Sequence, residues 1–304
     1  MDYKAKFEPK GDKIIHGAGQ NLDMFREYWK AIGKNKPVIY MTYVKMENMD
    51  AWVDKMKLPS KEFPNLVLQV GLNFLVDGKD ATKEISEGKY EEKFNTFLKV
   101  IKDFGNPVFV RAGYEFDKAG KYNPKSFIKA WKYLVDKFRR EKISNLATVW
   151  CACPYNGTSA VEPFYPGDDY VDWFGVDVFM ARHITGKYEP VENFIKLAEK
   201  HKKPVMVGES TPTRVGVDKG QESWDEWFKP YFEWISNHDI IKAFCYINWD
   251  WSKEWKINDR IKLEWLNGRI HENEIVKGHF TKEMSKSKYI HNQDINEFLK
   301  KVYH

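Results

Sequence analysis

Strand-like and helix-like segments alternate from one end of this chain to the other. The strand-like runs are short and apolar, and the segments between them carry apolar residues at the three- and four-residue spacing of a helix. Runs that are apolar on both faces are typical of parallel strands covered by helices. The eight expected strands span residues 13–16, 37–42, 66–72, 107–115, 146–152, 173–179, 204–209 and 241–248.

The expected helices fill the intervals between these strands. They span residues 22–32, 49–56, 90–104, 124–140, 191–200 and 223–237, with a closing helix at 293–302. Eight strands and their helices in 304 residues fit one (β/α)8 barrel, which takes about 250 residues plus insertions. We therefore predict an α/β fold, a TIM barrel, with residues 1–304 as one domain and a long insertion after the eighth strand.

Charge and cysteine content limit the classes of partner. The net charge of +5 comes from 49 basic and 44 acidic residues spread over helix faces such as 196–203, which favours a solvated surface over nucleic-acid binding. No apolar run approaches the roughly 20 residues of a membrane helix. Cys151, Cys153 and Cys245 lie in expected strands without metal or redox spacing, so we expect buried thiols. We expect a monomer that binds neither nucleic acid nor membranes.

The beginning of the chain bears on its location. Residues 1–13 are polar and charged and lack the apolar core of a signal peptide. We expect either a secreted or periplasmic protein whose leader is absent from this sequence, or a cytoplasmic protein.

Two of the expected strands end on a glutamate, Glu115 and Glu209. In a barrel of parallel strands the catalytic groups lie at the carboxyl ends of the strands. Hydrolysis of a glycosidic bond needs a proton for the departing oxygen and stabilisation of a cation-like sugar, and two carboxyl groups supply both. A separation of about 5 to 5.5 Å would permit covalent capture of the sugar with retained configuration. We assign Glu115 as acid and base, and Glu209 as nucleophile.

A cation is expected beneath this pair. Side chains alternate along a strand, so Arg111 points to the same side as Glu115, toward the barrel interior. A buried guanidinium must be paired, and Asp177 on the sixth strand can point inward as its partner. We expect Arg111 to keep Glu209 ionised and a less polar setting to raise the pKa of Glu115. A purely structural ion pair is the alternative for Arg111.

Further residues are candidates for sugar contacts. Trp249 and Trp251 follow the eighth strand, with Trp255 close behind, and amphipathic rings make good platforms for the apolar faces of sugars. We favour Trp251 for stacking and Trp249 for packing beneath it. His16 ends the first strand and could contact the sugar or be a core histidine. His183 is a further candidate, with an ordinary loop residue as its alternative.

The stretch 258–288 has mixed charge and little periodicity. A loop of that length without secondary structure is uncommon unless it has a function. We expect it to fold over the mouth of the barrel and shape the substrate cleft, and a surface insertion without function is the alternative.

The segment 110–115, VRAGYE, with Trp131 and Arg139 in the next helix, resembles the acid-bearing region of the clan of retaining glycoside hydrolases with (β/α)8 barrels. Within that clan the chain is most similar to glycoside hydrolase family 26, the β-mannanase family. The supporting segments are HGAGQ at 16–20, YPGDDYVD at 165–172, GVDV at 175–178 and KPVMVGES at 203–210. The resemblance implies an endo-acting catalytic barrel that cuts β-linked polysaccharide or oligosaccharide without a cofactor. It also implies Glu115 as acid/base and Glu209 as nucleophile.

Three departures from the mannanase pattern indicate a divergent branch. Tyr114 stands where mannanases have His, so contacts to the sugar beside the cleaved bond should differ. Phe179 stands where the clan usually has a Tyr that bonds the nucleophile, and 116–120 is not rich in aromatic residues. The resemblance leaves mannan, xylan, glucan and a sulfated algal galactan open as substrates.

Two other functions are alternatives to hydrolysis by two carboxylates. A barrel that binds glycans without cutting them is one alternative, and Phe179 is the best argument for it. A metal-dependent hydrolase is disfavoured because the eight histidines include no His-x-His and no His-Glu-x-x-His. We therefore expect no metal ion in the site.

Overall fold

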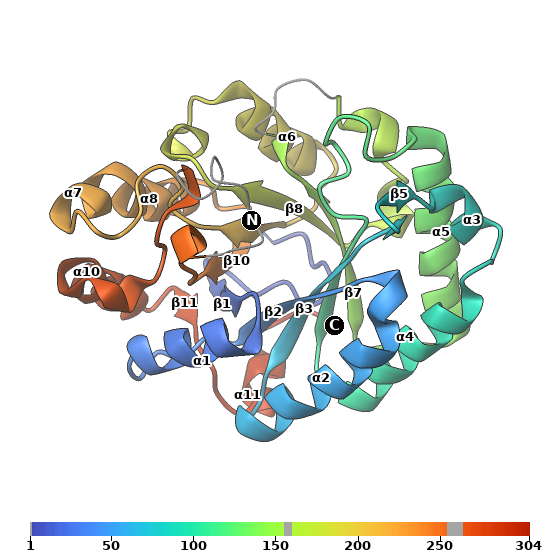
Figure 1. Cartoon of the computed structure of the whole chain (residues 1–304), viewed down its shortest axis with the longest axis horizontal. Helices are drawn as coiled ribbons and strands as arrows, with labels where there is room; N and C mark the ends of the chain where they lie inside the picture. The colour runs from blue at the N-terminus through green and yellow to red at the C-terminus, as the bar shows by residue number, and fades with distance from the viewer. Residues whose placement is uncertain (1, 155–159, 254–263) are drawn as a thin grey trace.

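The computed structural model describes residues 2–154, 160–253 and 264–304. Within these residues eight parallel strands close into a barrel, because the last of them pairs with the first (Figure 1). In barrel order the strands are β1 (Ile14–Gly19), β2 (Ile39–Val44), β3 (Val67–Leu72), β6 (Val108–Ala112), β7 (Leu146–Ala152), β8 (Trp173–Val178), β9 (Val205–Ser210) and β10 (Ile241–Ile247). The predicted (β/α)8 barrel is confirmed.

Helices surround the barrel and cover its outer face (Figure 1). They are α1 (Leu22–Ala31), α2 (Met49–Glu62), α4 (Glu91–Phe104), α5 (Pro124–Arg140), α6 (Glu189–Lys200), α7 (Gln221–Ser223), α8 (Lys229–Asn237) and α10 (Glu274–Met284). A π-helical turn, Trp224–Phe228, joins α7 to α8. Smaller elements decorate the loops: α3 (Thr82–Ser86), the hairpin of β4 (Leu75–Val76) and β5 (Lys79–Asp80), and 3-10 turns at Met46–Asn48, Glu162–Phe164, Asp168–Tyr170, Ala181–Ile184, Trp251–Lys253 and Ile270–Glu272.

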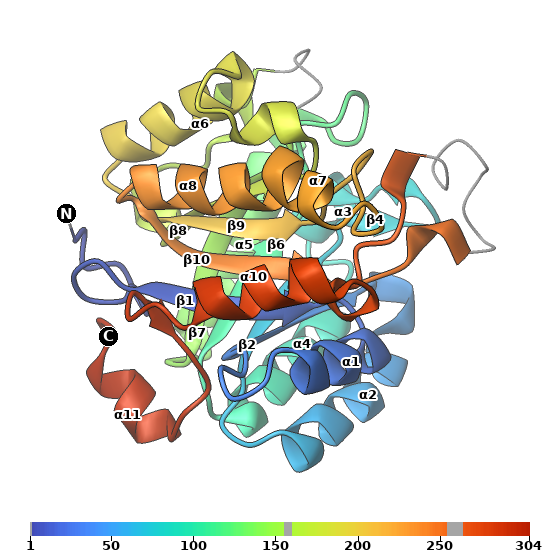
Figure 2. The same cartoon turned by 90° about the vertical axis from the view of Figure 1, so that its left-hand side faces the viewer.

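The last part of the chain differs from the prediction. The stretch 258–288 was expected to lack regular structure, but it contains α10, which lies between α8 and α1 and completes the ring of helices (Figure 2). Residues 264–269 of this stretch lie beside the loops that follow β9 and β10, where the backbone N–H of Arg214 donates to Glu264 O and that of Gly268 donates to Trp249 O. Residues 258–263 lie outside the described part. The expected closing helix is α11 (Ile295–Lys300), which follows the short strand β11 (Tyr289–Ile290) and lies beside the C-terminus (Figure 2). An isolated bridge between Pro9 and Val302 joins the two ends of the chain there.

Local sequence explains where α5 begins and which face it buries. The Asn123 side chain accepts hydrogen bonds from the backbone N–H groups of Lys125 and Ser126, and Pro124 occupies the first turn. The apolar stripe predicted for this helix is buried against the barrel and consists of Phe127, Ala130, Trp131, Leu134 and Phe138. In the described residues no helix combines the length and the apolar character needed to span a bilayer.

The barrel interior changes from apolar to polar along its axis. Phe7 packs on Phe109 and Phe109 packs on Trp173, which fills the end where the strands begin. All three cysteines are buried as free thiols, as expected. Near the carboxyl ends of the strands the interior contains buried polar side chains, among them Gln69, Arg111, Asp177 and Glu209. This polar layer positions the candidate site.

Candidate active site

Glu115 lies on a turn that follows β6 and is not part of the strand, which was predicted to extend to it. β6 ends at Ala112, and both Gly113 and Glu115 have positive φ, 55° and 53°. A Cβ at position 113 would lie 2.6 Å from the ring of Phe127, so only glycine fits this bend. The backbone N–H of Glu115 donates to Cys151 O at 2.8 Å, which ties the turn to β7.

Glu209 lies within β9, and an irregularity in strand pairing brings it beside Asp177. The β8–β9 register shifts between Val176 and Asp177, after which Asp177 pairs with Glu209. A bulge of this kind redirects side chains at the rim of a barrel. Both carboxylates consequently reach the guanidinium of Arg111.

Arg111 bonds both of these carboxylates. Its Nη2 atom lies 2.5 Å from Asp177 Oδ2 and 2.9 Å from Glu209 Oε1, and the Arg111 side chain is fully buried. Burial opposes the charge, but the carboxylates hold the pKa of Arg111 well above its ordinary value. The predicted pairing of Arg111 with Asp177 is confirmed, and the guanidinium also contacts Glu209 as expected.

The charges of Glu115 and Glu209 both act on the hydroxyl group of Tyr114. The ring of Tyr114 lies 5.1 Å from the guanidinium carbon of Arg111, and the pKa of Tyr114 is raised by burial and then by the charges of Glu209 and Glu115. The side chains of the two glutamates keep a small exposed fraction, 12% for Glu115 and 10% for Glu209. Both carboxylates are therefore close to Tyr114 and both remain open to solvent.

The predicted rise in the pKa of Glu115 is wrong. Burial does raise this pKa, but the positive charges of Lys118 and Lys121 outweigh burial and lower it overall. Lys118 Nζ lies 2.6 Å from Glu115 Oε2. Strand alternation could not reveal these lysines, because they belong to the turn that folds back after the strand.

Tyr43 is a site residue that the sequence reasoning missed. It belongs to β2, half-buried, and its ring centroid lies 5.5 Å from that of Tyr114. Burial and then the charge of Glu209 raise the pKa of Tyr43 well above its ordinary value. Two-residue periodicity along β2 from the interior residues Ile39 and Met41 could have found it.

His16 does not contact the site, so its prediction as a sugar contact is wrong. It is fully buried on the side of β1 that faces the helices, where Nε2 lies 2.7 Å from Tyr28 Oη and the ring stacks on Phe244. Its Nδ1 lies 3.1 Å from His291 Nδ1. Alternation along β1 points Ile15 inward and His16 outward, which makes it a core histidine.

His183 is also buried, and its prediction as a sugar contact is wrong for the same reason. It lies in the 3-10 turn after β8, fully excluded from solvent, and Nδ1 accepts from the backbone N–H groups of Phe179 and Met180. Burial lowers the pKa of His183 to about 3, followed by the charges of Arg182 and Arg214. It stabilises the turn after β8.

Aromatic residues line the region where β8 and β10 end. The ring of Trp251 packs edge-on against Trp265 at 4.8 Å, and Trp265 packs on Phe179 at the same distance. Trp249 and Trp251 are both half-buried against the cluster that fills the barrel interior, so the division into a packing ring and a stacking ring stays a prediction. Trp265 was not predicted, because it lies in a stretch without periodicity, and Trp255 lies outside the described residues.

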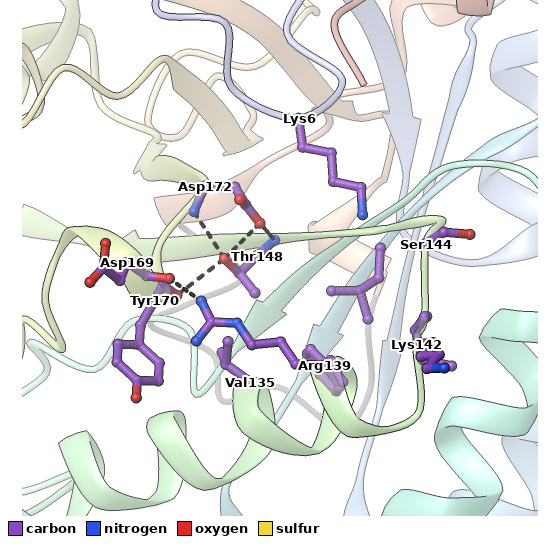
Figure 3. A pocket seen from close by; sticks show the side chains of 12 residues that line it. Lys6, Val135, Arg139, Lys142, Ser144, Thr148, Asp169, Tyr170 and Asp172 are labelled. Carbon is purple, nitrogen blue, oxygen red and sulfur yellow. Dashed lines mark hydrogen bonds between the residues drawn. The ribbon is translucent and has the colours of Figure 1, made fainter.

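A pocket of about 370 Å³ opens at the other end of the barrel (Figure 3). Its lining includes Lys6, which precedes β1, and Leu146, the first residue of β7. The acidic side chain of Asp172 there is bonded to Thr148, whose backbone N–H lies 2.7 Å from Asp172 Oδ2. Since the catalytic groups of such barrels lie at the carboxyl ends of the strands, the region of Glu115 and Glu209 is the candidate active site and this pocket is not.

Comparisons with known proteins identify the family of this chain. The family model of glycosyl hydrolase family 26 matches residues 92–259, more than half of the chain. The β-1,3-xylanase TXYA of Vibrio sp is 26% identical over 92% of this chain, and a β-1,3-xylanase of Alcaligenes sp is 26% identical over 80%. The chain spans 66% of the length of the first relative and 57% of the second.

Solved structures share the fold. The catalytic domain of a family 26 endo-β-1,4-mannanase from Bacillus sp. JAMB-750 superposes with a TM-score of 0.65 at 17% identity, covering 95% of this chain and 93% of that one. A family 26 protein from Muricauda sp. gives 0.63 at 13% identity, covering 93% and 89%. At these identities the superpositions support the barrel alone. The sequence match over more than half of the chain goes further: this chain belongs to glycosyl hydrolase family 26.

Proposed function

We propose that residues 1–304 form one catalytic domain, a retaining endo-β-glycosidase in which Glu115 is the acid/base and Glu209 the nucleophile. The observation that carries this proposal is the placement of two carboxylates, after β6 and in β9, that each keep a small exposed fraction. Glu209 bonds the buried Arg111 guanidinium, and the charge of that guanidinium also acts on Glu115. Family membership supports hydrolysis of glycosidic bonds.

The geometry supports separate roles for the two glutamates, attack on the sugar by Glu209 and proton transfer by Glu115. Arg111 holds Oε1 of Glu209, so the attack on the anomeric carbon is assigned to Oε2. In the first step Glu115 gives its proton to the glycosidic oxygen, the bond from that oxygen to the anomeric carbon breaks, and Glu209 forms an ester with the sugar. In the second step Glu115 takes a proton from water, whose oxygen attacks the anomeric carbon and releases Glu209.

The substrate we propose is a β-1,3-linked xylan. Two relatives that together match most of this chain carry the name β-1,3-xylanase. Tyr114 also supports a departure from mannan, because it replaces the histidine of the mannanase pattern. Its ring is near two cations: the Arg111 guanidinium carbon is 5.1 Å from the ring centroid and Lys121 Nζ is 4.6 Å from it.

A substrate panel tests the proposal. The purified chain is incubated with β-1,3-xylan, β-1,4-xylan, β-1,4-mannan and β-1,4-glucan, and release of reducing ends is measured together with product length. We expect oligosaccharides from β-1,3-xylan, with the β configuration at the new reducing end when it is observed early by proton NMR.

The matched variants are Glu209→Ala and Glu233→Ala, since Glu233 is exposed on α8. We expect Glu209→Ala to lose the release of reducing ends and Glu233→Ala to keep the activity of the wild type. Equal release by wild type and Glu209→Ala would exclude the assigned nucleophile. Binding of a glycan without release by the wild type would favour the barrel that binds without cutting.

A further inference from the structure

A lysine is bonded directly to the carboxyl group assigned as the acid. Two successive turns follow Glu115, in which the backbone N–H of Lys118 donates to Glu115 O at 3.2 Å and that of Lys121 donates to Lys118 O at 3.0 Å. These turns bring Lys118 Nζ to 2.6 Å from Glu115 Oε2. The oxygen that Lys118 bonds is one of the two that can deliver a proton.

This contact opposes the first step of the reaction. A general acid must hold its proton before it can give it away, whereas a cation in contact favours the ionised carboxylate. The Glu115 side chain is only 12% exposed, so burial by itself would favour the protonated form. Lys118 therefore favours the ionised form of Glu115, whereas burial favours the protonated form.

We propose that Lys118 acts on the reaction through Glu115, holding its carboxyl group ionised in the free enzyme and confining cleavage to lower pH than the buried setting would allow. Lys118 is a positioning residue in this proposal. The proposal rests on the assignment of Glu115 as the acid.

The other charged or titratable groups that act in this neighbourhood come from four strands and the turn. They are Arg111 and Tyr114 from β6 and its end, Asp117, Lys121 and Tyr122 from the turn and the residue after it, Cys153 after β7, Asp177 from β8 and Glu209 from β9. Their charges remain in place when Lys118 alone is replaced.

Two other cations near Glu115 are engaged elsewhere. Arg111 bonds Asp177 and Glu209, and Lys121 Nζ donates to Tyr114 O at 2.5 Å. Among the described side chains Lys118 makes the ion pair with Glu115. Its own side chain is 39% exposed, so it can leave the carboxylate when a sugar approaches, and salt should weaken its effect.

The test compares three variants by their pH profiles. Lys118→Met removes the charge and keeps the alkyl stem, Lys118→Arg restores a cation, and Lys125→Met removes an exposed lysine from the first turn of α5. The ratio kcat/KM is measured from acid to alkaline pH on the glycan that the wild type cleaves. In Lys118→Met the descending alkaline limb should move up by about one pH unit or more, while Lys118→Arg and Lys125→Met should follow the wild type.

A second readout separates this proposal from the proposed function. The Glu115 carboxyl group is titrated by carbon-13 NMR in wild type and Lys118→Met, with Glu115→Gln to assign the signal. If Lys118→Met raises both the pKa of Glu115 and the pH at which kcat/KM falls on the alkaline side, the proposal is supported. An unchanged pKa of Glu115 overturns it. A raised pKa with an unchanged alkaline limb shows that Glu115 is not the acid that limits the rate, which overturns its assignment and the proposal with it.

Discussion

Arg111 and Glu209 are joined across the barrel: Nη2 of Arg111, on β6, lies 2.9 Å from Oε1 of Glu209, on β9. The same nitrogen bonds Asp177, so one buried cation holds two carboxylates. A buried charge is tolerated when it is paired and becomes costly when its partner is removed. The arrangement therefore couples the stability of the barrel to the position of the proposed nucleophile.

Replacing Arg111 by Met should destabilise the fold and abolish activity together. Asp177 and Glu209 would face each other without a cation, at a cost of about 3 to 5 kcal/mol in the free energy of unfolding. Urea unfolding and kcat measure the two effects. The double variant Arg111→Met, Asp177→Asn should recover part of the stability and none of the activity. Full activity in Arg111→Met would contradict the role given to the guanidinium.

Gly208 tests how tightly this charge cluster is packed. A Cβ at this position would lie 2.6 Å from Asp177 Oδ1 and 2.9 Å from Arg111 Nε, so Gly208→Ala must push these groups apart. We expect a loss of about 1 to 3 kcal/mol in stability and a fall in kcat that exceeds the change in KM.

Gly278→Ala is the matched control, because nothing lies within 4 Å of a Cβ there, inside α10. Gly278→Ala should keep full activity, and its free energy of unfolding should rise by up to about 1 kcal/mol because alanine favours a helix more than glycine does. Equal activity in the two alanine variants would show that the space around Gly208 does not matter for catalysis.

The role of Glu115 predicts a dependence on the leaving group. Glu115→Ala should lower kcat/KM on ordinary glycosides by about 100- to 10,000-fold and spare aryl glycosides whose leaving groups need no proton. Glu209→Ala should lose activity on ordinary glycosides and on aryl glycosides alike. Steady-state rates on the two kinds of substrate make the comparison, and a uniform loss in Glu115→Ala would count against its role as acid.

Buried histidines predict a loss of stability in acid. His291 Nε2 donates to Met284 O, so its Nδ1 accepts from His16 Nδ1, while His16 Nε2 accepts from Tyr28. Burial, followed by the charge of His291, lowers the pKa of His16 well below its ordinary value. Protonation of His291 would set its Nδ1–H against the Nδ1–H of His16, and protonation of His16 would place an N–H on Nε2, where the Tyr28 hydroxyl now donates.

The sign of this effect follows from linkage. The unfolded chain takes up these protons near pH 6.5, and the folded chain does so only at lower pH, so stability present above about pH 6.5 is lost as the pH falls. Each such histidine contributes a slope of about 1.4 kcal/mol per pH unit. Urea unfolding at a series of pH values gives the slope of the free energy of unfolding against pH. This slope should be smaller in His16→Gln and in His183→Gln than in the wild type. It should be unchanged in His304→Gln, where the residue is exposed. Identical slopes in all four proteins would refute the assignment.

Much of the fold was readable from short-range patterns. The barrel, its strand order and the inward direction of Arg111 and Asp177 follow from two-residue and helical periodicity, which depends on neighbours a few positions away. The same patterns placed Glu209 in β9, but they extended β6 to Glu115, which lies on the turn after it, and the catalytic roles of both glutamates stay predictions. His16 shows the limit of this reasoning: it ends an expected strand, but a shift of one position decides whether it faces the sugar or the helices.

What local patterns could not supply were contacts made by turns and by distant segments. The turn after β6 brings Lys118 onto Glu115 and reverses the expected direction of its pKa, and Trp265 meets Phe179 from 86 residues further along the chain. Electrostatics and packing of this kind depend on distance in space. Periodicity carries the direction of a side chain within its own element, and only the closed barrel determines which charges surround it.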